Sequence, residues 1–184
     1  MALGLALAVT ASLAVTPQPP PAPRAPPAPG DSLVGRWTLD RGASGDVRRA
    51  IDTVTARMSF FIRPIARSRL RSANEVHEHL AITISATEIG TQVDREAPIL
   101  SPASGAVITW TRDNGDVFQL HSVLAGQRLL QTFVGKDGSS RENVFAPGPA
   151  GQTLDIGVTV AHPRLPRPVT YRLVYRRDTA AATR

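Results

Sequence analysis

The chain of 184 residues contains no cysteine, and this absence excludes several kinds of site at once. Disulfides, thiolate zinc sites, iron–sulfur clusters, cysteine nucleophiles and a lipid-modified N-terminal cysteine are all ruled out. Aromatic residues are scarce, and Lys136 is the only lysine among 21 basic residues. The length suits one domain, and an apolar share of 42% is too high for a fully disordered chain.

The longest apolar run, residues 1–16, carries no charge and consists mostly of Ala, Leu and Val. It falls short of the ~20 residues that a membrane-spanning helix needs, but it fits the apolar core of a secretory signal peptide. Small residues at Ala11, Ala14 and Thr16 suit cleavage. Because no Lys or Arg precedes the run, we expect the true start to lie upstream of Met1. The sequence predicts export, periplasmic or secreted; the alternative is an apolar anchor that stays attached.

More than half of residues 17–30 are proline, which has no amide donor and a fixed φ. Such a stretch predicts an extended polyproline linker, and the alternative is a docking motif for a proline-binding domain. We therefore expect the folded domain to span residues 31–177, with a disordered tail at 178–184.

Apolar and polar residues alternate with period two through most of this domain. The pattern predicts about nine strands, near residues 33–39, 80–84, 89–93, 106–110, 118–124, 129–134, 140–146, 154–160 and 169–175. Turn signals such as Asn114-Gly115 join them as antiparallel hairpins. We predict a mainly β fold, an antiparallel up-and-down barrel of about 8–9 strands, since closure removes exposed strand edges. The alternative is a β-sandwich.

A helical period replaces the alternation over residues 46–71. Apolar residues recur there at three- and four-residue steps, at Val47, Ile51, Val54, Met58, Phe61, Ile62 and Ile65. They form one stripe on a helix, which Ser44 or Asp46 caps. Pro64 is expected to kink or end it near residues 61–63. The pattern predicts one amphipathic helix, inserted after the first strand and packed over one end of the barrel.

The opening Gly35-Arg36-Trp37 resembles the first strand of the lipocalins and the wider calycin group. The resemblance implies a lipocalin-like barrel whose floor is closed by the Trp beneath an Arg from near the end of the last strand. Arg172, Arg176 and Arg177 are the candidates for that Arg. Only Arg177 keeps phase with the inward set of Tyr171, Leu173 and Tyr175.

A closer resemblance is to uncharacterised exported bacterial proteins with a single lipocalin-like barrel. Two segments carry it, residues 35–40 (GRWTLD) and residues 164–175 (RLPRPVTYRLVY). That group implies a fold without an established activity, so no functional residues follow from it.

Few residue patterns in the chain point to chemistry. His77-Glu78-His79 places two imidazoles on one side of an extended chain, but a metal would need a third ligand from elsewhere. The chain has no Gly-x-Ser-x-Gly elbow and no phosphate-binding glycine loop. We predict no metal, no cofactor and no catalytic residues, and hence a protein that is not an enzyme.

The net charge of +6 is concentrated in the predicted helix, where residues 46–71 hold seven Arg and two Asp. Nucleic acid is not an expected partner, because no aromatic residues interleave with these arginines. A weak contact with an anionic membrane surface is a hypothesis for this face. Its candidate residues are Arg48, Arg49, Arg57 and Arg67.

The barrel interior is the remaining candidate site, because barrels of this size are either filled by side chains or hold one small ligand. The large inward-phase residues are Trp37, Trp110, Phe118 and Tyr171. The leading prediction is an exported, non-enzymatic barrel that binds a small apolar molecule. The alternative is a cell-envelope protein-interaction module with a filled barrel. An enclosed apolar cavity of ~300 Å³ or more would favour the ligand.

Overall fold

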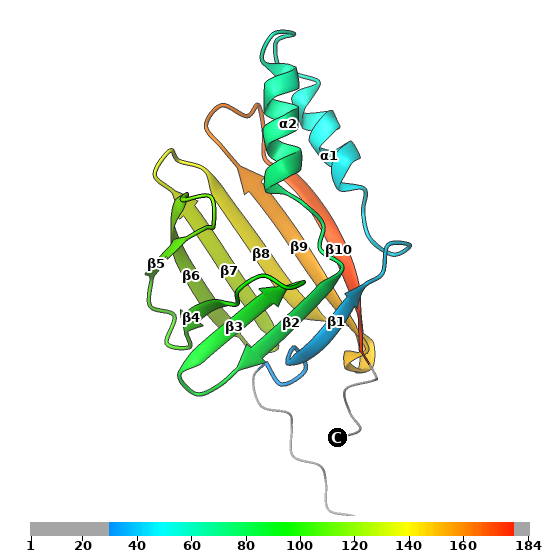
Figure 1. Cartoon of the computed structure of the whole chain (residues 1–184). Coiled ribbons are helices and arrows are strands. Elements are labelled where there is room, and N and C mark those ends of the chain that lie inside the picture. The colour runs from blue at the N-terminus through cyan, green and yellow to red at the C-terminus, as the bar shows by residue number, and fades with distance from the viewer. Residues whose placement is uncertain (1–29, 179–184) are drawn as a thin grey trace, which may run out of the picture.

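The computed structural model describes residues 30–178 (Figure 1). The predicted signal peptide and the linker up to residue 29 lie outside the described residues. Ten strands make up most of the domain. They are β1 (Gly35–Leu39), β2 (His79–Ile84), β3 (Glu88–Val93), β4 (Ile99–Pro102), β5 (Ile108–Thr111), β6 (Val117–Ala125), β7 (Arg128–Gly135), β8 (Ser140–Pro147), β9 (Thr153–Ala161) and β10 (Val169–Arg177). Two helices, α1 (Val47–Thr55) and α2 (Arg63–Ala73), separate β1 from β2, and a 3-10 helix, η1 (Pro149–Gly151), precedes β9.

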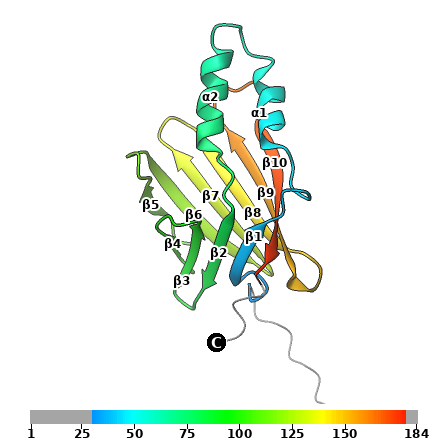
Figure 2. The same cartoon turned by 45° about the vertical axis from the view of Figure 1, so that its right-hand side comes forward.

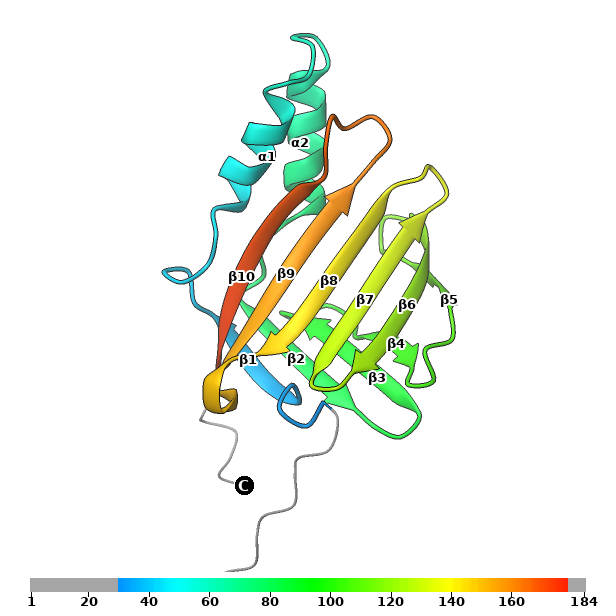
Figure 3. The same cartoon turned by 180° about the vertical axis from the view of Figure 1, so that it is seen from behind.

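The strands form one antiparallel sheet in the order β4-β3-β2-β1-β10-β9-β8-β7-β6-β5. Strands that follow one another in the chain are hydrogen-bonded neighbours except for β4 and β5. The first strand, β1, also pairs with the last, β10, and that pairing curls the sheet into a nearly closed barrel. Strands β4 and β5 form its two edges. Figure 3 shows the continuous wall from β10 to β6, and Figure 2 shows the helices standing at one end. The predicted up-and-down barrel is confirmed, and the sandwich alternative is set aside.

Strand β4 was not predicted, and it raises the number of strands to ten. Its four residues end in Pro102, which is paired opposite Glu88 of β3. Proline is tolerated there because β4 is an edge strand, whose outer amides need no partner in the sheet. The short length and the proline concealed the strand in the sequence.

The prediction of a single helix is wrong, because the chain turns back on itself between α1 and α2. Asp46 caps α1 as expected, accepting a hydrogen bond from the Arg49 amide at 2.9 Å. Pro64 lies in the first turn of α2, where the missing amide has no helical partner to lose. Pro64 therefore starts the second helix, and the break falls earlier, after Thr55.

The predicted apolar stripe is correct only in its first half. Val47, Ile51 and Val54 are buried against the barrel in the same core cluster as Val169 of β10. By contrast, Phe61 is 84% exposed, and Ile62 and Ile65 are 56% and 58% exposed. The apolar residues of the stripe therefore keep their helical spacing in the sequence beyond Val54, the last of them that is buried. No helix among residues 30–178 is long and apolar enough to cross a membrane.

The floor of the barrel is closed by Trp37 and Arg177, which lie opposite each other where β1 pairs with β10. The guanidinium sits 4.2 Å from the centroid of the fully buried indole, and the indole amine donates to the Leu33 carbonyl. Arg177 also donates to the carbonyls of Ser32, Val34 and Gly151, each at 2.7 Å. The role that the calycin resemblance implies for Arg177 is what the structure shows.

Gly35 completes this motif for a steric reason. Its φ of +139° is unfavourable for residues with a side chain, and a Cβ at this position would lie 2.7 Å from Nη1 of Arg177. The Gly-x-Trp pattern thus leaves room for the arginine that covers the tryptophan.

Arg177→Ala should lower the free energy of unfolding by about 2–4 kcal/mol, since it removes a desolvated cation–π contact and three hydrogen bonds to carbonyls. The neighbouring Arg176→Ala is the matched control. Arg176 is exposed and pairs with Asp40 on the outer face, so its loss should cost less than about 1 kcal/mol. Urea unfolding measures the free energy of unfolding of both variants. Equal losses in the two variants would contradict the role of Arg177 in closing the floor.

Candidate functional site

The interior of the barrel changes character along its axis. The half near the floor is apolar and filled, with Leu33, Ile82, Leu129 and Leu154 all at 1% exposure or less. Toward the helices, inward-phase residues such as Trp110, Phe118 and Val160 are only half-buried. Inward side chains that solvent reaches indicate a mouth at the helical end, which is where barrels usually admit ligands.

A layer of polar side chains separates the two halves, and we call Thr91, Gln131, Asn143, Arg141, Asn74 and Tyr171 the polar layer. Gln131 of β7 donates to Thr91 of β3 at 3.2 Å, a bond that crosses the interior, because β3 and β7 are not neighbours in the sheet. Asn143 of β8 donates in turn to Gln131 at 3.4 Å. These buried groups satisfy one another, as buried polar groups must.

Arg141 joins the polar layer to the helices. Its Nε donates to Asn143 at 2.9 Å, and its Nη1 donates to the Asn74 side chain at 3.2 Å. Asn74, which ends α2 and is 3% exposed, also accepts from the Tyr171 hydroxyl at 3.0 Å. Burial raises the pKa of Tyr171 above its usual value, so this hydroxyl stays a neutral donor at ordinary pH.

The charge of Arg141 has only neutral acceptors around it. Among the ion pairs within residues 30–178, none includes Arg141. A guanidinium that is half-buried inside a barrel usually has an anionic partner, because removing it from water is costly. The interior therefore offers one positive charge without a carboxylate from the described part of the chain.

One hydroxyl group beside the polar layer has no hydrogen-bond partner in the described part of the chain. The Ser122 hydroxyl of β6 is fully buried, lies opposite Gln131 in the register, and has no hydrogen-bond partner within residues 30–178. Such a group in a folded protein calls for a specific reason, and a hydrogen bond to a bound water or ligand is one.

Aromatic side chains form the apolar wall beside Arg141. Phe133 of β7 lies opposite Arg141 in the β7–β8 register. Its ring centroid is 5.3 Å from that of Trp110 and 6.4 Å from that of Phe118, both in edge-on geometries. We call these three residues the aromatic cluster. It places a large apolar surface next to an uncompensated cation.

The structure divides the four residues that were predicted to bind a ligand. Trp110 and Phe118 belong to the aromatic cluster, and Tyr171 belongs to the polar layer. Trp37 lies at the opposite end, fully buried beneath Arg177 in the floor. The predicted site residues did not include Arg141, Asn143 or Gln131. Each of these is a polar residue at an inward-facing position of an alternating strand, and that exception to the alternation could have identified them.

The predicted anionic-surface residues are also dispersed. Arg48 and Arg49 are exposed in the first turn of α1, and Arg57 lies in the turn between the helices. Arg67 pairs with Asp52 at 2.8 Å and thereby joins α2 to α1. The four arginines therefore come from three parts of the helical insertion: the first turn of α1, the turn after it, and α2.

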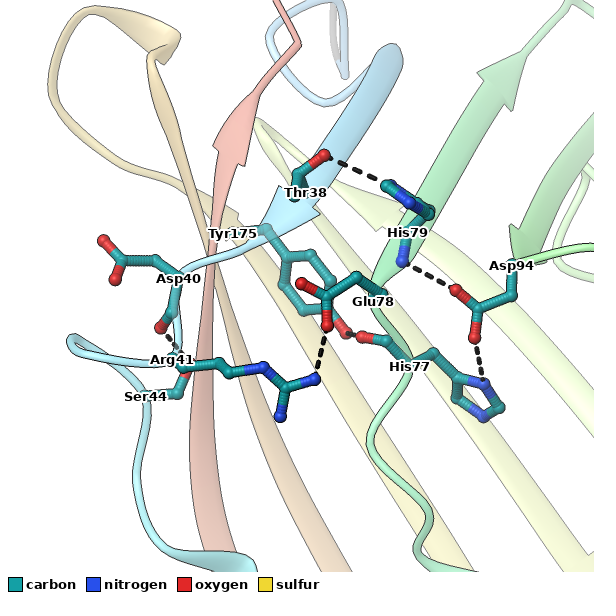
Figure 4. A network of polar contacts seen from close by, with 9 residues as sticks. All are labelled: Thr38, Asp40, Arg41, Ser44, His77, Glu78, His79, Asp94 and Tyr175. Carbon is teal, nitrogen blue, oxygen red and sulfur yellow. Dashed lines mark hydrogen bonds and ion pairs between the residues drawn. The ribbon is translucent and has the colours of Figure 1, made fainter.

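The histidine pair belongs to a structural network at the start of β2 (Figure 4). Asp94 accepts from the His79 amide at 2.8 Å and lies 3.0 Å from the His77 ring. Burial opposes ionisation of Asp94, but these two hydrogen bonds outweigh it and hold its pKa below the usual value. The Tyr175 hydroxyl donates to the His77 carbonyl. Burial raises the pKa of Tyr175 to about 12. Within residues 30–178 no group of three or more His, Asp or Glu has the arrangement of a metal site.

Two hollows lie on the outer side of β1 and β2, one of about 890 Å³ and one of about 70 Å³. Both are open, and Arg36, His79, Asp94 and Asp178 line both of them. Neither is the enclosed apolar cavity that would mark a binding site for an apolar molecule. The polar layer and the aromatic cluster are therefore the stronger candidate site.

Solved structures similar to this chain are small barrels of one kind. An abundant heat soluble (SAHS) protein from Ramazzottius varieornatus aligns with a TM-score of 0.58 and 12% identity, over 81% of this chain and 97% of that one. A fatty acid binding protein from Schistosoma mansoni, solved with arachidonic acid, gives 0.53 and 17%, over 82% and 99%. Lipid binding protein 8 of Caenorhabditis elegans gives 0.52 and 9%, over 80% and 96%.

These likenesses show a calycin-like barrel fold and, at such low identity, the fold alone. No family model matches the chain. No curated protein matches it either.

Proposed function

We propose that this protein is a non-enzymatic carrier that binds one amphipathic molecule with an anionic head and an apolar tail. The observation that carries the proposal is Arg141, a cation inside the barrel with neutral acceptors only and with the aromatic cluster beside it. A carboxylate on the ligand would supply the missing charge through charge-assisted hydrogen bonds. The tail would then lie against the aromatic cluster.

Two further features support this occupant. The Ser122 hydroxyl lies opposite Gln131 of the polar layer and has no hydrogen-bond partner within residues 30–178. Two of the similar barrels are named for fatty acids or lipids, and one of these holds arachidonic acid, an amphipathic acid of this kind. The alternative is an interaction module of the cell envelope with no ligand, and the filled half of the interior near the floor is the observation in its favour.

Arg141→Gln tests the proposal, because glutamine retains hydrogen bonding but removes the charge. Binding is measured by displacement of a fluorescent long-chain fatty acid, with oleic acid and oleyl alcohol as competitors. We expect the variant to lose about tenfold or more affinity for oleic acid, about 1.4 kcal/mol, and little for the alcohol.

Arg128→Gln is the matched control, since Arg128 is the exposed first residue of β7 and its replacement should leave both affinities unchanged. Circular dichroism checks that the variants fold. A parent protein that binds neither competitor would overturn the carrier function and favour the interaction module. Equal binding of oleic acid by parent and Arg141→Gln would remove Arg141 from the site.

We further propose that the protein is exported, to the periplasm or beyond the cell. The uncharged apolar run at residues 1–16 and the proline-rich linker after it support this location. The intact mass of the protein from its own host is expected to lack residues 1–16. A mature chain that retains Met1 would contradict export.

A further inference from the structure

The turn between α1 and α2 presents an unusual apolar surface to solvent. Phe60 is 76% exposed and Phe61 is 84% exposed, and Ile62 and Ile65 follow at 56% and 58%. The two rings pack edge to face with centroids 5.7 Å apart. We call residues 57–65 the helical tip. Contiguous exposed aromatic and aliphatic side chains of this kind mark an interaction surface.

The helical tip is held in place by polar contacts at its base. Asp52 of α1 pairs with both Arg67 and Arg71 of α2, at 2.8 and 2.9 Å, and so fastens the two helices together. Arg63 donates to the Met58 carbonyl at 2.9 Å and braces the turn. The phenylalanines therefore project from a defined turn at the end of the helix pair that lies farthest from the strands (Figures 1 and 2).

Charge around the helical tip is of one sign. Between Asp52 and Glu75 the sequence has five arginines and no acidic residue. Of these, Arg57 and Arg69 are exposed and belong to none of the ion pairs within residues 30–178. Cations next to exposed aromatic side chains suit the headgroup region of an anionic bilayer. The apolar side chains can enter its acyl boundary while the arginines remain among the phosphates.

From this geometry we infer that the helical tip docks the protein on anionic phospholipid membranes. The phenylalanines insert at the headgroup boundary, and Arg57 and Arg69 contact lipid phosphates. Of the four arginines that the sequence predicted to contact an anionic surface, this proposal keeps Arg57 and leaves out Arg48, Arg49 and Arg67. It lies apart from Arg141 and does not depend on the proposed ligand.

Flotation with phosphatidylcholine vesicles, with and without phosphatidylglycerol, tests the inference. The parent should float with the anionic vesicles, and less so as salt concentration rises. The double variant Phe60→Ser, Phe61→Ser should lose about tenfold or more in affinity, because two apolar side chains no longer insert. Arg57→Gln with Arg69→Gln should weaken binding several-fold and flatten its dependence on salt.

The matched control is Leu100→Ser with Val107→Ser, which removes exposed apolar surface near β4 and β5 and should leave binding unchanged. Arg141→Gln should also bind vesicles like the parent, so membrane docking and ligand binding can fail separately. All replaced tip residues are exposed, and thermal melts confirm folding. A parent that ignores anionic vesicles, or a Phe60/Phe61 variant that binds them equally well, would overturn the inference. So would a lipid-free parent dimer that this variant converts to monomers, since a second copy would then cover the helical tip.

Discussion

The stack of Arg177 on Trp37 is the contact on which the rest of this barrel depends. It lies where the first and last strands pair, so it fixes both the closure of the sheet and the register of β1 against β10. Three carbonyls accept hydrogen bonds from the same guanidinium and bring residues 32–34 and η1 to the floor. One side chain thus secures the floor of the barrel, and the opposite end is left to the helices.

The interior follows from this closure. Apolar residues fill the half next to Trp37, and the bond between Thr91 and Gln131 crosses the barrel above them. Polar groups in that position cost stability unless they satisfy one another, and most of them do. Two groups are exceptions: the charge of Arg141 has only neutral acceptors, and the Ser122 hydroxyl has no hydrogen-bond partner within residues 30–178. The proposed anionic ligand would supply the charge that Arg141 lacks.

Sequence patterns predicted the barrel well, because its strands alternate and its turns carry Asn-Gly and similar signals. The calycin resemblance implied the roles of Gly35 and Trp37, and phase along the last strand then selected Arg177 from the three candidate arginines. The helical tip could not be predicted, since Phe61, Ile62 and Ile65 keep the spacing of a buried stripe although solvent surrounds them. Arg141 was one arginine among many. Its significance appears only in the structure, where the register places it opposite Phe133 and where none of the ion pairs within residues 30–178 includes it.

Native mass spectrometry of the protein purified from its own host tests the central claim most directly. We expect a fraction of the protein to carry one small molecule, which is released on denaturation and identified as an amphipathic acid. A bare chain that also takes up no added long-chain carboxylate would contradict the carrier function, and the charge of Arg141 would then need another explanation.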